Sequence, residues 1–470
     1  MRSRIKNQTI VGVAVALALA AGSVSATNGY YTHGVGTKQK SQAGAGSADP
    51  QEILAMATNP AGIAFIPESI DAGLGLFSPM RDYKTTESLA NGGCMAPGQC
   101  AYTIGPNNLS SKNELFFVPY VAMNWALSDA DYFAAAFYGR GGMNTKWEGG
   151  TATYDPFFGQ NPESGPTTFD GTYGGGTAGV DLMQGFINLS YARKFADSFS
   201  LGLSAIIAIQ RFEARGVSNF APFTKTYAES LFTTGQPEIP KKLSGNGHDM
   251  SYGYGGSIGV QWNPVDMFSI AAAYTSEMSM SKFGEYKDLF ADKGGFDMPA
   301  TATIGLAFKP NDRWSLMFDW QEVYYSDIGS VGNPIQNIFT CPTLDPTSTS
   351  FEGCLGGKKG AGFGWKDMSV YKFGGSWKYS DHWTFRGGYS SADQPIRKDQ
   401  MTFNILAPGV MEEHWTVGFS MTGTSGNEFT MSFMYAPEYS IRGPQNFDPT
   451  QDVKLSMKQY EVEFAYSWKR

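Results

Sequence analysis

The last part of the chain reads YEVEFAYSW over residues 460–468, in which every second residue is aromatic or aliphatic. Glu461 and Glu463 stand between these apolar residues. Strict alternation of this kind predicts a β-strand with one apolar and one polar face. The stretches at residues 314–321 and 383–389 alternate in the same way. In a transmembrane barrel the apolar face would contact lipid and the polar face would line the lumen.

The composition excludes several classes of protein. Charged residues make up only 17% of the 470 residues, below the roughly 25% of typical soluble domains, whereas aromatics reach 14% and glycine is present 57 times. After the first 25 residues, no run of about 18 apolar residues predicts a transmembrane helix. The wealth of Tyr, Phe and Trp argues against a disordered chain. A glycine- and aromatic-rich all-β protein remains.

The connections between the strand-like stretches alternate between short and long. Six short gaps, each containing Asp or Asn, are typical of tight turns. With seven long gaps between them, they predict a 14-stranded antiparallel transmembrane β-barrel over residues 69–470 with long extracellular loops. A β-sandwich would also alternate, but would not place aromatics at strand ends beside turns. The short gaps are 128–131, 196–198, 263–266, 310–312, 380–382 and 424–427; the long gaps are 82–112, 142–180, 216–249, 281–297, 329–366, 394–412 and 438–452.

The N-terminus has the features of an export signal. Basic residues precede an apolar region at residues 10–21, and small residues at 24–26 offer a cleavage site. The apolar region is too short to span the membrane as an anchor. We therefore predict a signal peptide over residues 1–26 and a mature chain that begins at Thr27.

Four cysteines lie in two of the long gaps, as two local pairs: Cys94 with Cys100, and Cys341 with Cys354. In an exported protein, disulfides are the expected state of such pairs. No histidine or carboxylate lies between Cys94 and Cys100, so we expect no metal site and no other cofactor. The net charge of -8 argues against a nucleic-acid partner.

Residues 27–68 precede the first predicted strand and are rich in Gly, Ala and Ser. They contain Asn59-Pro60-Ala61-Gly62. The segment could lie in the periplasm, on a partner, or in the lumen. Because fourteen strands enclose a bore too wide for side chains alone to fill, we predict that it plugs the barrel.

Several stretches together resemble the FadL family of long-chain fatty acid transporters, which includes the TodX-type aromatic hydrocarbon channels. The resemblance implies a fourteen-stranded barrel closed by an N-terminal hatch at residues 27–68, and passive uptake of hydrophobic molecules across the outer membrane. Ligand would move from a loop groove to an inner pocket and leave sideways through the barrel wall. The stretches that carry the resemblance are residues 28–34, 44–46, 59–62, 298–308, 314, 319, 364–367, 383–389 and 395.

Two loop segments are candidates for the apolar groove, because their apolar residues recur at helical spacing. They contain Phe223, Tyr227 and Leu231, and Phe283, Tyr286 and Phe290. The same residues could equally form a core that holds the loops together.

The resemblance also implies an Arg and a Lys that hold a ligand carboxylate, and by motif these are Arg211 and Lys366. Arg211 shares its strand face with Leu203 and Ile207, a face expected to contact lipid. A β-bulge would turn it inward. Otherwise both residues are rim cations that face lipopolysaccharide phosphates.

The leading hypothesis is therefore a monomeric outer-membrane channel for long-chain fatty acids, surrounded by lipid and lipopolysaccharide. The first alternative is uptake of aromatic hydrocarbons or alkanes by the same fold. An outer-membrane enzyme would need a serine–histidine pair in the lumen, for which His414 is the one weak candidate, so we expect no enzymatic activity. A general porin or an adhesin is the third alternative.

Overall fold

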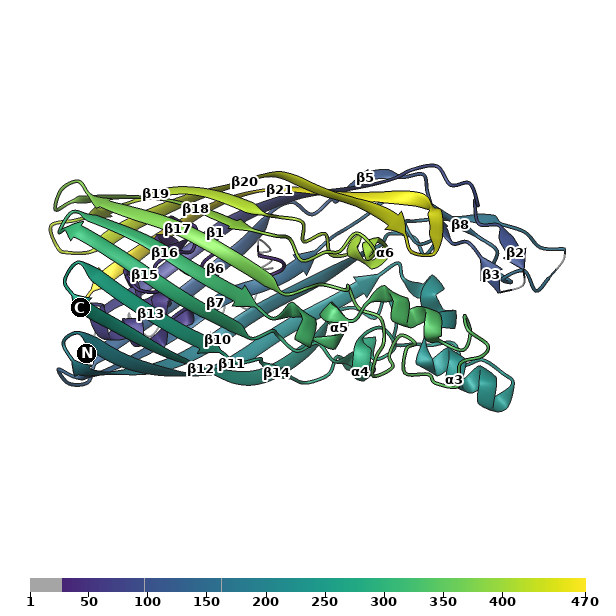
Figure 1. The fold of residues 1–470 in the computed structure, drawn as a ribbon, viewed down its shortest axis with the longest axis horizontal. Coiled ribbons are helices and arrows are strands. Elements are labelled where there is room, and N and C mark those ends of the chain that lie inside the picture. Colours follow the sequence, from purple (N-terminus) through teal and green to yellow (C-terminus); the bar gives the residue numbers. More distant parts are fainter. Residues whose placement is uncertain (1–27, 97, 162) are drawn as a thin grey trace, which may run out of the picture.

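Fourteen long strands form a closed antiparallel barrel in the computed structural model, which describes residues 28–96, 98–161 and 163–470 (Figure 1). The predicted barrel is confirmed, whereas the predicted signal peptide lies outside the described residues. The strands are β1 (Ser69–Thr85), β6 (Phe116–Ala126), β7 (Asp131–Asn144), β10 (Gly179–Ala196), β11 (Phe199–Arg215), β12 (Asp249–Val265), β13 (Phe268–Thr275), β15 (Thr301–Asn311), β16 (Trp314–Val323), β17 (Met368–Lys378), β18 (Trp383–Ala392), β19 (Glu413–Thr422), β20 (Glu428–Gln445) and β21 (Asp448–Lys469).

The barrel closes where its first and last strands meet. β1 pairs with β21 along its whole length, from Ser69 opposite Lys469 to Thr85 opposite Val453. Every other long strand pairs with its sequence neighbours over at least part of its length, so the sheet closes on itself. Two short strands, β5 (Asn108–Ser110) and β14 (Ser279–Met280), extend the pairing of β1 and β12.

Alternation along the strands sorts the side chains between the two faces of the wall. In β21, Glu461 and Glu463 are buried inside, whereas Phe464, Tyr466 and Trp468 are exposed on the outside. The outer face thus carries the apolar and aromatic side chains that a lipid environment requires.

The six predicted short turns lie together at the end of the barrel that carries the C-terminus, and long loops lie at the other end (Figure 1). One predicted long loop, at residues 438–452, is wrong. There β20 and β21 continue as a hairpin with only Asn446 and Phe447 between them.

The loops contain short strands and helical turns (Figure 1). Within the described ranges, no helix is long and apolar enough to cross a membrane. The loop elements are β2 (Cys94–Ala96), β3 (Gln99–Cys100), β4 (Thr103–Ile104), β8 (Thr151–Tyr154), β9 (Thr167–Asp170), η3 (Ser218–Phe223), α3 (Lys225–Thr234), η4 (Gly284–Tyr286), α4 (Ala291–Gly294), η5 (Tyr325–Asp327), α5 (Gly329–Gly332), η6 (Ile335–Thr340) and α6 (Met401–Asn404).

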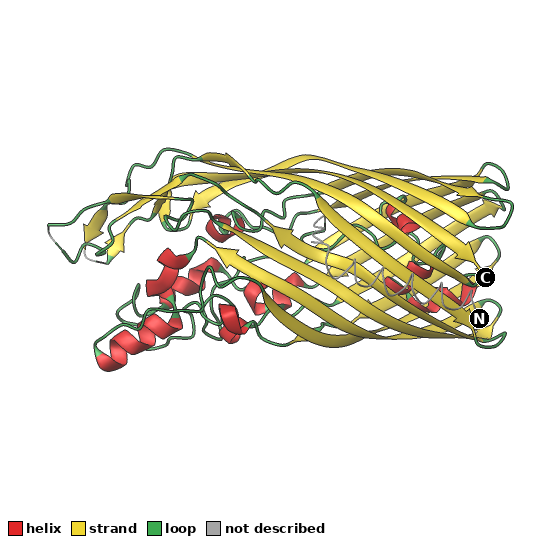
Figure 2. Cartoon of the chain, turned by 180° about the vertical axis from the view of Figure 1, so that it is seen from behind, coloured by secondary structure: helices red, strands yellow, loops and turns green. Residues whose placement is uncertain are grey.

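Residues 28–68 lie inside the barrel as α2 (Thr37–Lys40), η1 (Ile53–Ala57) and η2 (Pro60–Phe65) (Figure 2). We call them the N-terminal segment. Asn59 caps η2 by accepting a hydrogen bond from the Ala61 amide at 3.1 Å. Glycines of the wall allow η2 to approach closely, because a Cβ atom at Gly202 would lie 2.3 Å from the Ala61 nitrogen.

Candidate functional site

The barrel wall is incomplete between β6 and β7. These strands pair only from Tyr120 opposite Tyr138 down to the turn that joins them. Beyond Tyr138, β7 pairs with β10 alone, and a bulge at Arg140 interrupts its register opposite Gln184. We call this interval, where β7 has no β6 partner, the wall gap.

The N-terminal segment takes the place of β6 at the wall gap. Tyr31 forms an antiparallel bridge with Gly141 of β7. The Gly142 amide donates to the Tyr30 carbonyl at 3.0 Å, and the Thr32 amide donates to the Arg140 carbonyl at 2.9 Å. Backbone groups that the gap would leave unpaired are therefore satisfied by the chain's own beginning.

Tyr325, on η5 of a long loop, holds the start of this segment from the other side. Its hydroxyl donates to the Asn28 carbonyl and accepts from the amides of Tyr30 at 3.2 Å and Tyr31 at 3.3 Å. Burial raises the pKa of Tyr325 well above its usual range, so the hydroxyl keeps its proton. Its ring packs edge-on against Trp365 at 5.2 Å, which joins the segment to the loop core.

Ion pairs fix the segment deeper in the lumen. The Lys40 ammonium lies 2.6 Å from Oε1 of Glu461 and 2.6 Å from Oε2 of Glu463, and all three side chains are buried. We call these three residues the Lys40 cluster. Lys38 pairs with Glu428 at 2.5 Å. Because both cations lie on α2 and the carboxylates lie on β20 and β21, these ion pairs tie the segment to the last two strands of the barrel.

The motif Asn59-Pro60-Ala61-Gly62 anchors the segment to β11 and β12. The Asn59 amide group donates to the Val260 carbonyl at 3.2 Å, and the Ser200 hydroxyl donates to the Ala61 carbonyl at 2.9 Å. These contacts attach the motif to the barrel wall. Its role in gating stays a prediction.

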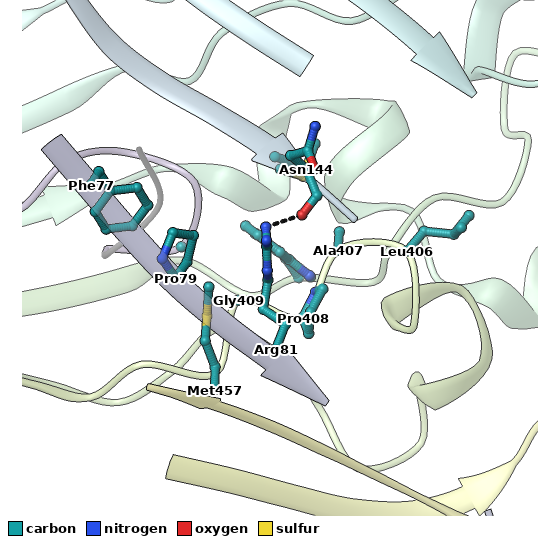
Figure 3. A pocket seen from close by; sticks show the side chains of 12 residues that line it. Phe77, Pro79, Arg81, Asn144, Leu406, Ala407, Pro408, Gly409 and Met457 are labelled. Carbon is teal, nitrogen blue, oxygen red and sulfur yellow. Dashed lines mark hydrogen bonds between the residues drawn. The ribbon is translucent and has the colours of Figure 1, made fainter. Parts of the chain in front are cut away.

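Two small cavities lie above the N-terminal segment. One, of about 40 Å³, has an almost wholly apolar lining that includes Phe212, Phe220 and Phe290. The other, of about 20 Å³, adjoins Gly29 and contains Arg81 (Figure 3). Leu406 lines both cavities, so they are neighbours that share one side chain in their walls.

The predicted groove residues divide between the loop core and the surface. Phe283, Tyr286 and Phe290 are buried around Phe212, with ring centroids 5.5, 4.9 and 4.6 Å from its ring. Phe223 is also buried. Phe290 further lines the apolar cavity, so it serves both the loop core and a ligand space.

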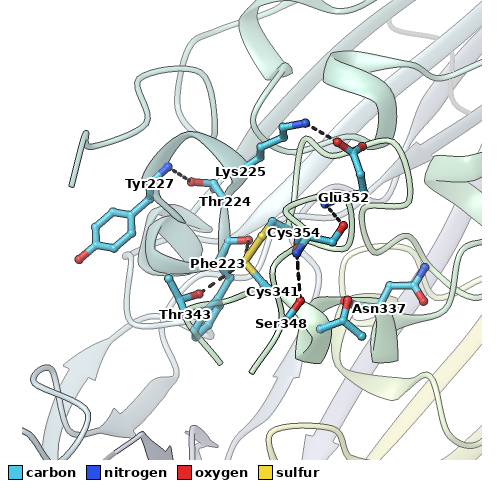
Figure 4. Close-up of a disulfide and its surroundings, with 12 residues drawn as sticks. Phe223, Thr224, Lys225, Tyr227, Asn337, Cys341, Thr343, Ser348, Glu352 and Cys354 are labelled. Atoms are coloured by element: carbon cyan, nitrogen blue, oxygen red, sulfur yellow. Dashed lines mark hydrogen bonds and ion pairs between the residues drawn. A yellow bond between two sulfur atoms is a disulfide. The ribbon is translucent and has the colours of Figure 1, made fainter. Parts of the chain in front are cut away.

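Tyr227 and Leu231 lie half-buried on α3. This helix sits on the buried disulfide Cys341–Cys354, with which Ala228 packs (Figure 4). The second disulfide, Cys94–Cys100, joins β2 and β3 in an outlying hairpin.

The two residues predicted to hold a carboxylate do not line either cavity. Arg211 lies on the outer face, 3.3 Å from Asp181, because β11 keeps its register on β10 through this position and no bulge turns the side chain inward. Lys366 is exposed just before β17, whereas its neighbour Trp365 is buried. The structure thus corrects both placements.

Two cations that the sequence analysis missed, Arg81 and Arg140, are buried in the lumen. Arg140 lies at the bulge of β7, with its guanidinium 4.9 Å from the centre of the Tyr31 ring. Arg81 shares the inward face of β1 with Asp71, Phe77 and Tyr83, a parity that would have revealed it.

The lumen also contains a serine–histidine pair. The Ser390 hydroxyl lies 3.0 Å from Nδ1 of His414, whose ring stacks on His33 at 5.7 Å. Nε2 of His414 has no hydrogen-bond partner among the described residues. Likewise, in the part of the chain that the structure describes, no group of three or more His, Cys, Asp or Glu side chains could hold a metal ion.

Comparison with known proteins gives a consistent picture. The family model described as "Outer membrane protein transport protein (OMPP1/FadL/TodX)" matches residues 17–436. The chain is 28% identical over 316 residues to a long-chain fatty acid transport protein of Escherichia coli O157:H7, a match that covers 60% of this chain and 67% of that protein.

Solved structures share the fold at low sequence identity. The toluene transporter TbuX of Ralstonia pickettii matches with a TM-score of 0.56 at 19% identity, over 93% of this chain and 98% of that one. A Pseudomonas aeruginosa FadL homologue matches with a TM-score of 0.59 at 16% identity, over 94% and 99%.

Proposed function

Since the chain belongs to the OMPP1/FadL/TodX family of outer membrane transport proteins, we propose that it is a channel for passive uptake of long-chain fatty acids or similar hydrophobic molecules. The observation that supports this most is the wall gap, which the chain's own N-terminal segment fills through the Tyr31–Gly141 bridge. A barrel closed in this way excludes water and ions, yet needs only a local rearrangement to open sideways.

The proposed path begins in the loops. A hydrophobic ligand gains about 25 cal/mol for each Å² of apolar surface that it removes from water, which favours entry into the cavity lined by Phe212, Phe220 and Phe290. The ligand then reaches the cavity beside Gly29, at the start of the N-terminal segment. Displacement of residues 28–32 from β7 would open the wall gap, and the ligand would leave between β6 and β7 into the membrane. In this proposal residues 27–68 act as the hatch.

The second candidate is uptake of aromatic hydrocarbons or alkanes through the same path. The apolar cavity favours it in one respect, because its lining is rich in phenylalanine rings. The relative named as a long-chain fatty acid transport protein favours fatty acids, and we rank these first.

We propose transport without catalysis, because the Ser390–His414 pair offers no route for a substrate. Both residues are buried, and the histidine ring is covered by His33 of the N-terminal segment. We further propose that the protein works as a monomer, since one barrel contains the whole path. Its outer face, rich in exposed apolar side chains such as Leu203 and Val417, would contact lipid, with lipopolysaccharide around the loops.

Uptake by intact cells tests the function. A strain without its own outer-membrane route for fatty acids, producing this chain, should accumulate radiolabelled hexadecanoate in a saturable manner, whereas cells with an empty vector should not. Uptake of toluene but not hexadecanoate would favour the second candidate. If neither compound enters faster than in the vector control, the transport function is wrong.

A further inference from the structure

Three cations stand side by side on the outer face of the wall, where β20, β21 and β1 are neighbours. The register places Lys454 of β21 directly opposite Arg442 of β20 and directly opposite Lys84 of β1. All three are exposed, and the residues before and after each of them are buried on the inner face. Directly opposed residues on one face of an antiparallel pair have Cβ atoms about 5 Å apart, so the three charges form a compact group. We call it the cation row.

The cation row carries more positive charge than the protein itself neutralises. Arg442 pairs with Asp452 at 2.9 Å. Among the residues that the structure describes, neither lysine of the row has a carboxylate within ion-pair distance, and the nearby Asp82 instead accepts from the Ser110 hydroxyl. Like charges directly opposite one another destabilise a sheet. The row is therefore unfavourable unless an anion from outside the chain compensates it.

The height of the cation row places it outside the hydrocarbon, toward the loop end of the barrel (Figure 1). On the outer face, Tyr460 of β21 stacks on Tyr435 of β20, with ring centroids 5.3 Å apart, and Trp468 lies at the other end of β21. Aromatic side chains of this kind mark the two membrane interfaces of a barrel. Lys454 lies six residues beyond Tyr460. That separation is about 20 Å along the strand, or about 15 Å along the membrane normal for a tilt of about 40°.

An anion at this height belongs to lipopolysaccharide rather than to a phospholipid. The phosphate of a phospholipid lies at the hydrocarbon boundary, close to Tyr460. Lipopolysaccharide carries phosphates on its lipid part and also on the sugars above it, so its anionic layer extends farther outward. Lys458, which lies on the same face between Tyr460 and Lys454, is at the height of the lower phosphates. Both ammonium and guanidinium groups form strong charge-assisted hydrogen bonds with phosphate.

We propose that the cation row, together with Lys458, binds the phosphate groups of a lipopolysaccharide molecule that lies against β20, β21 and β1. The phosphates on the sugars contact the row. The acyl chains descend over exposed apolar side chains of the same strands, such as Phe433 and Phe464. This inference concerns the outer surface of the barrel, and it does not depend on which molecule the channel transports.

Binding of fluorescently labelled rough lipopolysaccharide to the purified full-length protein in detergent tests the inference. The wild-type protein should bind it about tenfold or more tightly than the same lipopolysaccharide stripped of phosphate with hydrofluoric acid. A triple variant without the cation row should lose this preference, because glutamine keeps the polar surface but not the charge. The triple variant combines Lys84→Gln, Arg442→Gln and Lys454→Gln.

A matched control removes three exposed cations from the end of the barrel that carries the six short turns. It should prefer phosphorylated lipopolysaccharide as strongly as the wild type does. Equal loss of the preference in both triple variants would overturn the proposal, because net charge alone would then attract the ligand. A wild-type protein without the preference, or a cation-row variant that keeps it, would overturn it as well. The control combines Arg193→Gln, Arg313→Gln and Lys378→Gln.

The wild-type protein provides a second test that needs no variant. Its midpoint of thermal unfolding should rise when phosphorylated lipopolysaccharide is added. Inorganic phosphate and phosphatidylglycerol in mixed micelles, at the same phosphate concentration, should not raise it. No rise with lipopolysaccharide, or an equal rise with either of the other two probes, would contradict the proposed site. Uptake of hexadecanoate is measured separately, so failure of this site leaves the transport function standing.

Discussion

Tyr31 and Gly141 form a two-residue bridge across a part of the barrel wall where β7 lacks its sequence neighbour β6. Tyr31 belongs to the N-terminal segment, and Gly141 belongs to β7. The barrel is therefore completed by a segment that is not one of its strands. Because such a bridge holds with few hydrogen bonds, we expect it to open without disturbing the rest of the sheet.

A side chain at position 141 should open the wall gap. A Cβ atom on Gly141 would lie 2.5 Å from the Gln184 side-chain oxygen and 3.0 Å from the Tyr30 carbonyl. Gly141→Val should thus displace residues 30–32 and raise ion conductance in planar bilayers several-fold. Gly185→Ala is the matched control, because its Cβ would lie 3.6 Å from Phe137, an ordinary contact. Conductance of the valine variant at the wild-type level would show that the bridge does not seal the barrel.

Loss of the Tyr325 hydroxyl should loosen the segment without removing any packing. Tyr325→Phe leaves the Asn28 carbonyl and the amides of Tyr30 and Tyr31 without this partner, at a cost of about 1–3 kcal/mol. We expect faster protease cleavage within residues 28–32 and a higher rate of hexadecanoate uptake. Tyr286→Phe, which removes a buried hydroxyl bonded to Gly247 in the loop core, should leave both unchanged. Equal behaviour of the two variants would show that the Tyr325 hydroxyl does not hold the N-terminal segment in place.

The Lys40 cluster should hold the segment mainly through charge. Lys40→Met leaves Glu461 and Glu463 buried together without their cation, which should cost about 3–5 kcal/mol of segment docking. The expected result is a higher bilayer conductance and a lower midpoint of thermal unfolding. Adding Glu461→Gln and Glu463→Gln to the same chain should restore much of the loss.

Lys38→Met serves as the comparison for charge removal on the same helix, because its pair with Glu428 is more exposed. It should have a smaller effect on conductance and on unfolding. If both methionine variants behave alike, or if the triple variant is no better than Lys40→Met, buried charge is not what holds the segment.

The barrel was predictable because its signals are local. Alternation fixes which face of each strand meets lipid, and turn residues mark the six short connections. The prediction failed at residues 438–452, where β20 and β21 extend beyond the expected strands. We infer that strands above the hydrocarbon no longer need an apolar outer face, so the alternation that identifies them fades in stretches such as Arg442 to Gln445.

The site was harder to predict because it depends on contacts far apart in sequence. At the wall gap, residues 30–32 supply hydrogen bonds to β7, a pairing that no local sequence pattern indicates. Arg81 was missed because a long gap was expected from residue 82, which put this residue at the end of the first strand, whereas β1 continues to Thr85. Arg211 was misplaced because a motif was followed where unbroken alternation indicated the outer face.

The two disulfides should differ in their importance for ligand binding. Cys341 and Cys354 are buried beneath α3 and adjoin Phe223 and Leu355, and Leu355 lines the apolar cavity (Figure 4). Replacing both with alanine should destabilise the loops by about 2–4 kcal/mol and weaken hexadecanoate binding. Alanine at both Cys94 and Cys100 removes a bridge from an outlying hairpin and should leave binding unchanged. Titration of hexadecanoate, together with protease cleavage around α3, checks both results. Equal binding by the two double variants would show that the buried disulfide does not shape the ligand site.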